Sequence, residues 1–409
     1  MAIDNKDKKV LKSSIEREQN EVACSAECEK IKGSKNLNVP PLRFPEFTEE
    51  WKAEQLDNIA TLSKGIGISK EQLSEDGEPC ILYGELYTKY KSEIIKQVES
   101  KTDINGSKLK RSKANDVIIP CSGETAVDIA TARCVPFDNI LFGGDLNVIS
   151  LHQYDGAFMS YQLNGKRKYD IARVAQGVSI VHLYGEHLKA IKTYNPTLPE
   201  QQKIAKLLSL LDDRIDTQNK IIEKLQSLIK GLRVCCMQRV YGNNVYLSEI
   251  AQIYQPQTIS STELTEDGFL VYGANGIIGK YKDYNHETEQ ICITCRGNTC
   301  GMVNYTKPMS WITGNAMVIN TDKYQDKVCK RYLYHYLSAY NFNSIISGSG
   351  QPQIVRTPLE KLKITLPTIS EQKQKAIIFD KIQDKIDINH KVLNLYIGQK
   401  QYLLRQMFI

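Results

Sequence analysis

The stretch PTLPEQQKIAKLLSLLDDRIDTQNKIIEKLQSLIKGL occupies residues 196–232, and PTISEQKQKAIIFDKIQDKIDINHKVLNLYIGQKQYLLRQMF occupies residues 367–408. When their first prolines are aligned without gaps, identical residues fall opposite one another. These pairs include Pro196 and Pro367, Glu200 and Glu371, Gln201 and Gln372, Asp213 and Asp384, and Asp216 and Asp387. The chain therefore carries one long segment twice.

Each copy has apolar residues at alternating steps of four and three, which predicts a coiled-coil helix rather than a short amphipathic one. In the first copy this seam is Ile204, Leu208, Leu211, Ile215, Gln218, Ile222, Leu225, Ile229 and Leu232. In the second copy it is Phe379, Ile382, Ile386, Asn389, Leu393, Tyr396, Lys400, Leu403 and Met407. The alternative is that each helix packs only on its own domain, but such helices seldom keep heptads over this length.

Gln218 and Asn389 are equivalent polar positions near the middle of the two seams. A polar pair across a seam costs stability but fixes the register. We therefore expect the helices to pair with each other in antiparallel fashion and to act as a spacer between two globular units.

The repeat extends beyond the helices. Residues 55–77 match residues 246–268 without a gap, VIIPCSGET (117–125) parallels ICITCRGNT (291–299), and GGDLNVIS (143–150) parallels TGNAMVIN (313–320). A period this long indicates tandem duplication of one domain. The fold class expected is α+β, with two mixed α/β units, two long helices and a pseudo-two-fold, circular arrangement. The boundaries expected are an N-terminal arm at 1–45, a first unit at 46–195, a central helix at 196–241, a second unit at 242–366 and a distal helix at 367–409.

The composition is that of a soluble globular protein: 409 residues with 41% hydrophobic and 24% charged side chains. The formal net charge of +6 is compatible with a polyanionic partner without requiring one. No apolar run is long enough for a membrane span, and the polar start is not a signal peptide, so we expect a cytoplasmic protein. Cys292 and Cys295 have the C-x2-C spacing of a zinc site, but no second pair follows. We interpret them as small hydrophobes in a buried strand, and no metal is expected.

This organisation resembles the specificity subunit of type I restriction–modification systems. The resemblance rests on NVPPLRFPEFTEEWKAEQLDNIATLSKG at the entrance, LPEQQKIAKLLSLLDDRID in the centre, SEQKQKAIIFDKIQDKID near the end, and the closing LLRQMF. It implies that each unit is a target-recognition domain that reads half of a bipartite, asymmetric DNA site. It also implies that the helices hold two modification subunits with the adenine methyltransferase chemistry, and that motor–nuclease subunits join that core.

Under this resemblance the chain is not an enzyme. An amino-methyltransferase needs an Asn/Asp-Pro-Pro-aromatic loop, and neither NVPPL nor NPTLP fits that pattern. GANGIIGKY (273–281) departs from a phosphate loop both in its glycine spacing and at Tyr281. No cofactor is expected in this chain, whereas the methyl donor S-adenosylmethionine is expected in the modification subunit. The other function class considered is a coiled-coil scaffold that binds proteins and has no DNA specificity.

Base reading favours Arg or Lys for guanine and Asn or Gln for adenine, while hydroxyl groups contact phosphates. The DNA-binding candidates are Lys64, Lys70, Ser122, Glu124, Thr125, Ser179, His182, Gln255, Gln257, Arg296, Asn298, Gln351, Gln353 and Arg356. KLKRSK (108–113) is interpreted as a solvated charge run or a phosphate contact. The candidates for the coiled coil and partner binding are Glu200, Gln201, Leu208, Leu211, Ile215, Gln218, Ile222, Glu371, Gln372, Phe379, Ile382, Ile386, Asn389 and Leu393.

Overall fold

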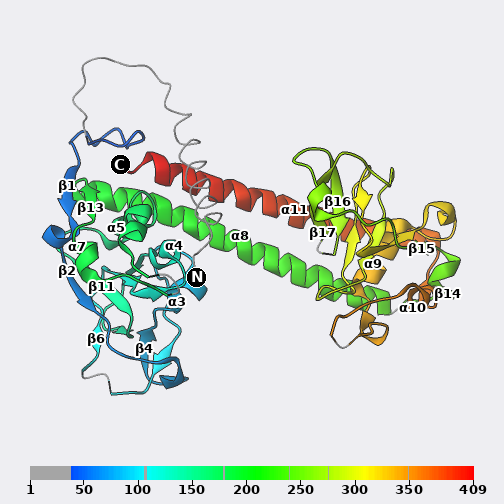
Figure 1. Ribbon diagram of the computed structural model, residues 1–409, viewed down its shortest axis with the longest axis horizontal. Coiled ribbons are helices and arrows are strands. Elements are labelled where there is room, and N and C mark those ends of the chain that lie inside the picture. Colours follow the sequence, from blue (N-terminus) through cyan, green and yellow to red (C-terminus); the bar gives the residue numbers. More distant parts are fainter. Residues whose placement is uncertain (1–37, 106–107, 178–179, 239, 275, 349) are drawn as a thin grey trace, which may run out of the picture. The chain divides into compact units, whose positions relative to one another are not determined.

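The computed structural model describes residues 38–105, 108–177, 180–238, 240–274, 276–348 and 350–409. It divides into two compact units (Figure 1). Unit 1 comprises residues 1–209 and 400–409, and unit 2 comprises residues 210–399. Residues 1–37, most of the N-terminal arm proposed from the sequence, lie outside the described residues.

Unit 1 contains two main sheets. One has the strand order β2-β11-β7-β9 and is antiparallel throughout. The other has the order β3-β5-β4-β10-β6, in which β10 and β4 pair in parallel. The strands are β1 (Lys52–Gln55), β2 (Ala60–Lys64), β3 (Leu73–Ser74), β4 (Glu78–Ile81), β5 (Lys101–Thr102), β6 (Lys110–Arg111), β7 (Asp116–Pro120), β8 (Ser122–Gly123), β9 (Arg133–Val135), β10 (Leu141–Phe142), β11 (Leu146–Leu151), β12 (Val181–His182) and β13 (Lys192–Asn195).

The helices of unit 1 are short, apart from the ends of the two long helices described below. They are α2 (Leu56–Ile59), η1 (Lys70–Gln72), α3 (Glu85–Thr88), α4 (Ala126–Ile129), α5 (Gly156–Asn164), α6 (Lys168–Val174) and α7 (Gly185–Lys189). β7 is buried along its whole length because both of its faces are covered. Val117 and Ile119 belong to one core cluster, and Ile118 belongs to another. Alternate side chains of a strand point to opposite faces, so one strand contributes to both cores.

Unit 2 repeats the same plan with fewer strands. Its four-stranded antiparallel sheet has the order β15-β21-β18-β19, and a three-stranded sheet has the order β17-β16-β20. The strands are β14 (Asn243–Tyr246), β15 (Gln252–Tyr254), β16 (Phe269–Gly273), β17 (Gly276–Tyr281), β18 (Ile291–Thr294), β19 (Val303–Tyr305), β20 (Trp311–Ile312), β21 (Ala316–Asn320) and β22 (Lys363–Leu366). The short helices are η3 (Leu247–Glu249), η4 (Ser261–Glu263), η5 (Asp322–Tyr324), α9 (Lys330–Ala339), η6 (Phe342–Ser344) and α10 (Arg356–Glu360).

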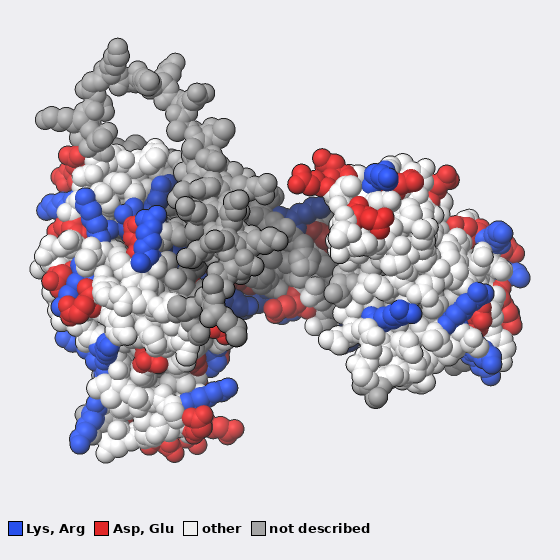
Figure 2. All heavy atoms as spheres, in the orientation of Figure 1, with Lys and Arg blue, Asp and Glu red and all other residues white. Residues whose placement is uncertain are grey.

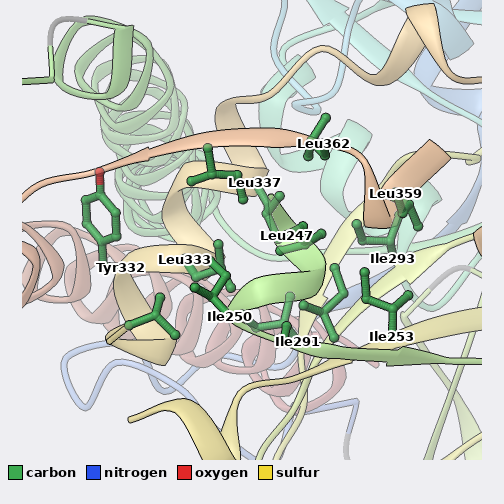
Figure 3. Packing of buried hydrophobic residues seen from close by; sticks show 14 of the residues in the cluster. Leu247, Ile250, Ile253, Ile291, Ile293, Tyr332, Leu333, Leu337, Leu359 and Leu362 are labelled. Atoms are coloured by element: carbon green, nitrogen blue, oxygen red, sulfur yellow. The ribbon is translucent and has the colours of Figure 1, made fainter. Parts of the chain in front are cut away.

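The core of unit 2 lies between its four-stranded sheet and α9. Ile291 and Ile293 of β18 belong to one core cluster with Leu333 and Leu337 of α9, and Figure 3 shows Ile293 beside Leu359 of α10. Tyr336 of α9 is half-buried beside Leu333 and Leu337. Burial of each such leucine or isoleucine stabilises the fold by roughly 1.5–3 kcal/mol.

The duplication is visible in the pairing of strands at both ends of each unit. β1 pairs with β13, and β14 pairs with β22, both antiparallel and each joining the entrance of a unit to the strand before a long helix. The expected fold class is therefore confirmed as two tandem mixed units with two long helices. α8 spans Leu198–Gln238, and α11 spans Ile369–Gln406.

Within unit 2 the two long helices run antiparallel (Figure 1). Three contacts establish the direction, because residues later in α8 meet residues earlier in α11. The Arg214 guanidinium lies 5.8 Å from the Tyr396 ring centroid, and Gln218 Nε2 donates to Asn389 Oδ1 at 2.5 Å. Further along, Lys375 Nζ donates to the carbonyl oxygen of Cys236 at 3.3 Å.

Unit 1 holds the first turns of α8 and the last residues of α11. Glu200 is fully buried and accepts hydrogen bonds from the Arg43 guanidinium at 2.6 Å and from Trp51 Nε1 at 3.3 Å. The Trp51 ring also packs edge-on against Phe158 and Phe408, at centroid distances of 5.7 and 6.4 Å. The entrance segment and the C-terminal segment therefore share one small aromatic core in this unit.

Candidate nucleic-acid interface

In unit 1, two candidate residues from distant parts of the chain meet on paired strands. β8 and β12 are antiparallel, with Ser122 opposite His182. The pairing continues where Leu183 N donates to Cys121 O at 2.8 Å. Tyr87 supports the turn, because its hydroxyl donates to Ser122 O at 3.2 Å. We call Ser122 and His182 the unit-1 turn pair.

In unit 2, an equivalent arrangement brings Arg296 opposite Gln353 in an isolated antiparallel bridge. Ile354 N donates to Cys295 O at 3.0 Å, which reproduces the bond from Leu183 to Cys121 in unit 1. Both Arg296 and Gln353 are exposed. We call them the unit-2 turn pair. The duplicated scaffold thus presents different side chains at one structural position.

Beside each turn pair, a third candidate residue stands at the end of an edge strand. Lys64 ends β2, and its ammonium lies 5.8 Å from the centroid of the Tyr184 ring. Gln255, the repeat equivalent of Lys64, directly follows β15. Its Nε2 donates to Gly314 O, so part of this amide is already engaged within unit 2. Only the remaining part of the Gln255 side chain can face a ligand.

Some of the other candidates have a structural use. Thr125 Oγ1 accepts from Asp128 N at 3.1 Å and caps α4, and Arg356 Nε bonds Glu360 Oε1 at 2.7 Å within α10. Lys70 begins η1, beside the five-stranded sheet, and no contact joins it to the unit-1 turn pair among the described residues. Ser179 lies outside the described residues. Four other candidates are exposed and have no such bond to any residue that the structure describes: Glu124, Gln257, Asn298 and Gln351.

Sequence reasoning missed two residues at the unit-1 turn pair. Tyr184 is 46% exposed and stacks on His182 at a centroid distance of 6.2 Å. Asp145 Oδ2 accepts a hydrogen bond from Ser122 Oγ at 3.2 Å. The pairing preferences for guanine and adenine favour cationic and amide side chains, so they single out neither an aromatic ring nor an aspartate. Two signals were available for Asp145: its place within the repeated GGDLNVIS segment, and the ability of an aspartate to accept a hydrogen bond from cytosine N4.

Three thiols near these turns, those of Cys121, Cys292 and Cys295, are buried. Burial raises the pKa of the Cys121 thiol to about 11 and that of Cys292 to about 12. Cys292 lies in β18 and Cys295 directly follows that strand, and the two belong to different core clusters, as expected for positions of opposite parity. They act as small hydrophobes, and the described ranges contain no group of three potential metal ligands.

The face shown in Figure 2 carries no single-sign patch of charge that would mark it as the interface. On the face shown in Figure 2, Lys and Arg side chains are interspersed with Asp and Glu in each unit. In unit 1 a pocket of about 340 Å³ has Lys110 and Lys113 on its wall, together with the buried Asp116 carboxylate and His152. No ion pair involves these two lysines within the described part of the chain. They belong to the KLKRSK run.

The helix candidates are ten seam residues and four polar residues outside the seam. The seam residues Leu208, Leu211, Ile215, Gln218, Ile222, Phe379, Ile382, Ile386, Asn389 and Leu393 are buried or half-buried. Three polar candidates, by contrast, are held inside their own units. Glu200 bonds as described above, Gln201 Oε1 accepts from Asp155 N at 2.9 Å, and Gln372 Oε1 accepts from Cys329 N at 2.8 Å. These three side chains therefore have no exposed surface to offer a partner. Glu371 is exposed, and its carboxylate caps α11 by accepting a hydrogen bond from Thr368 N at 3.0 Å.

Exposed apolar residues recur on the part of α8 and α11 that belongs to unit 2, with charged residues such as Arg214, Lys224 and Lys381 between them. We call these apolar residues the second apolar stripe. In heptad terms its residues occupy the c and g positions, away from the a and d seam. They are exposed by 38–57%, apart from Leu395 at 72%. The members are Leu210, Ile221 and Leu228 of α8, and Ile378, Ile388 and Leu395 of α11. No helix within the described ranges is long and apolar enough to cross a membrane.

The family model described as the type I restriction modification DNA specificity domain matches residues 48–227 and 243–395. The chain belongs to this family. It is 25% identical to the type I restriction enzyme MjaVIII specificity subunit of Methanocaldococcus jannaschii, over 86% of this chain and 89% of that protein. It is 31% identical to the EcoprrI specificity subunit of Escherichia coli, but that match covers only 35% of this chain and 36% of the relative.

Two solved structures share the fold. The S subunit of a type I restriction–modification system from M. genitalium matches with a TM-score of 0.63 and 19% identity, over 91% of this chain and 99% of that one. A chain from a study of complex assembly and conformational transition of the type I R-M system matches with a TM-score of 0.54 and 15% identity, over 90% of this chain and 99% of that one. At these identities the likeness concerns the fold.

Proposed function

We propose that this chain is the DNA sequence-recognition subunit of a type I restriction–modification complex and that it reads a bipartite, asymmetric site. The observation that carries the proposal is the duplicated turn pair. Ser122 and His182 in unit 1 occupy the place of Arg296 and Gln353 in unit 2. One scaffold with two sets of hydrogen-bonding groups suits the recognition of two different half-sites, because base edges are distinguished by their donors and acceptors.

The second apolar stripe supports docking of helical partners on α8 and α11. An apolar stripe at heptad positions on the outer side of a helix pair packs well against further helices. We assign this surface to two modification subunits, which carry the adenine methyltransferase chemistry and bind S-adenosylmethionine. Motor–nuclease subunits complete the restriction enzyme. The chain itself performs no chemistry in this proposal, and it works in the cytoplasm, where the complex meets DNA.

The proposed role of the long helices is to set the gap between the two half-sites. α8 has 41 residues, and a helix of that length measures roughly 60 Å at 1.5 Å per residue. One turn of DNA measures about 34–36 Å. The helix is thus long enough for the half-sites to lie a turn apart. This function of the helices is a prediction that the insertion experiment described in the Discussion tests.

The deciding experiment is methylation of DNA by the full chain together with its modification partner. Mapping of methylated adenines should yield one split motif with a constant gap, and the purified chain without the partner should transfer no methyl group from S-adenosylmethionine. Sequence-specific binding of short duplexes should require both half-sites. A scaffold without DNA specificity would give methylation unrelated to any motif and equal binding of all duplexes, and that result would refute the proposal.

A further inference from the structure

Asp145 lies in the turn that leads into β11, next to the unit-1 turn pair. Its carbonyl oxygen accepts a hydrogen bond from Cys121 N at 2.7 Å, and its Oδ2 accepts from Ser122 Oγ at 3.2 Å. The residue has a φ of 57°, a left-handed conformation that aspartate adopts more readily than most residues. These bonds hold an exposed carboxylate at a defined place beside Ser122.

This carboxylate retains hydrogen-bonding capacity. Among the described residues, nothing donates to its Oδ1, and no Lys or Arg nitrogen lies within ion-pair distance. Lys64 is nevertheless close by, because the register pairs Lys64 with Asn147 and Gly65 N donates to Leu146 O at 2.9 Å. Both charges act on the nearby Cys121 thiol: burial raises its pKa most, Lys64 lowers it and Asp145 raises it. The cation partly offsets the repulsion between the carboxylate and DNA phosphates.

The equivalent position in unit 2 carries an amide. Asn315 O accepts from Cys295 N at 3.0 Å, as Asp145 O accepts from Cys121 N, and the Asn315 side chain is exposed as well. A carboxylate only accepts hydrogen bonds, whereas an amide both donates and accepts. The two units therefore differ in polarity at one matched position.

Resting on the proposed function, we propose that Asp145 determines specificity in unit 1 by accepting a hydrogen bond from the N4 amino group of a cytosine. In the major groove, guanine presents only acceptors, and thymine presents an acceptor and a methyl group. Adenine presents an N6 donor, but its N7 acceptor stands beside that donor. Cytosine presents a donor without an adjacent ring acceptor, so it is the base that an acceptor-only side chain favours.

The test is Asp145→Asn in the full chain, co-expressed with the modification partner, followed by mapping of methylated adenines. The half-site that belongs to unit 1 is identified by exchange of residues 46–195. We expect the variant to change one cytosine of that half-site to adenine or to a mixture, because an amide pairs with adenine. In duplex binding, the preference for the original cytosine should fall by about tenfold or more.

The controls separate this inference from the proposed function. Glu75→Gln removes another exposed carboxylate of unit 1 and should leave the motif unchanged. Asn315→Asp makes the reverse change in unit 2 and should alter only the other half-site. An unchanged motif for Asp145→Asn, or an equal loss of binding on all sequences, overturns the inference. If the wild-type chain itself specifies no split motif, the proposed function fails instead.

Discussion

Gln218 and Asn389, which are 171 residues apart and equivalent in the repeat, form a hydrogen bond with each other across the helix seam. The Gln218 side chain is nearly buried, and Asn389 Nδ2 also donates to Lys385 O at 2.6 Å. A polar pair inside an apolar seam fixes register, since any slip would bury an unpaired amide. The antiparallel pairing inferred from the sequence is thereby confirmed within unit 2.

Single replacement of either amide should destabilise the chain more than replacement of both. Gln218→Leu or Asn389→Leu leaves one amide without its partner, at a cost of about 1–3 kcal/mol. The double variant removes both polar groups and should be close to wild type in the free energy of unfolding. Chemical denaturation of all four proteins measures the coupling. Additive effects of the two replacements would mean that the hydrogen bond does not contribute to the pairing.

Insertion of four residues after Gln218 should lengthen the gap in the methylated site by about two base pairs. Four residues add roughly 6 Å and about one helical turn, so the apolar stripe is almost preserved. Insertion of two residues instead rotates the stripe by about 200° and exposes Ile222 and Ile229, so that this variant should not assemble. The gap length is read from methylated sites in cells that carry each variant. A four-residue insert with an unchanged gap would contradict a role of the helices in spacing.

Exchange of residues 46–195 for the same region of a relative should change one half of the methylated motif and leave the other half and the gap unchanged. The physical reason is that unit 1 and unit 2 each have their own core clusters and their own turn pair. Methylation mapping measures the outcome, and reversion to the original segment serves as the control. A change in both halves would show that the units do not read independently.

Unit 2 should lose stability as the pH falls below about 6.5. Burial lowers the pKa of His335, which lies between Arg233 Nε at 3.2 Å and Asp380 Oδ1 at 2.8 Å. The histidine is therefore neutral in the fold but binds a proton in the unfolded chain, so acid favours unfolding. The loss approaches about 1.4 kcal/mol for each pH unit between the unfolded and the folded pKa.

The measurement is chemical denaturation of unit 2 within the full chain at pH 7.5 and at pH 5.5. His335→Gln should lose much of this pH dependence. Part should remain, because burial also lowers the pKa of His286 in the same unit. If the variant keeps the whole acid sensitivity of the wild type, His335 is not its source.

Lys110→Ala and Lys113→Ala should weaken DNA binding to the same extent on all sequences. Both lysines line the pocket of unit 1 and have no ion-pair partner in the part of the chain that the structure describes. Removal of one phosphate contact should reduce the slope of log K against log salt by about 0.9. Lys52→Ala, at an exposed position in β1, is the matched control. A change in the recognised motif, or an unchanged salt slope, would rule out a phosphate contact.

The long helices and the duplication could be predicted because their signals are local and repeated. Heptad spacing is visible in a single helix, and alignment of the two copies is enough to place Gln218 opposite Asn389. The interface could be predicted only in part. Arg296 and Asn298 stand in one turn that the sequence reveals. Nothing in the local sequence relates Ser122 to His182, and nothing there shows that Thr125 caps α4 instead of contacting DNA.

The sequence by itself determined the pairing of the helices and the two-unit plan, because an apolar period of 3.5 residues must be buried along one line. Only the tertiary structure decided which side chains meet at the turns. The β8–β12 pairing joins Ser122 to His182, and the turn before β11 adds Asp145 to them. Strand pairing between distant segments depends on how the whole sheet packs. The register of the two strands, and therefore which side chains lie next to each other, follows from the complete core rather than from any one stretch of residues.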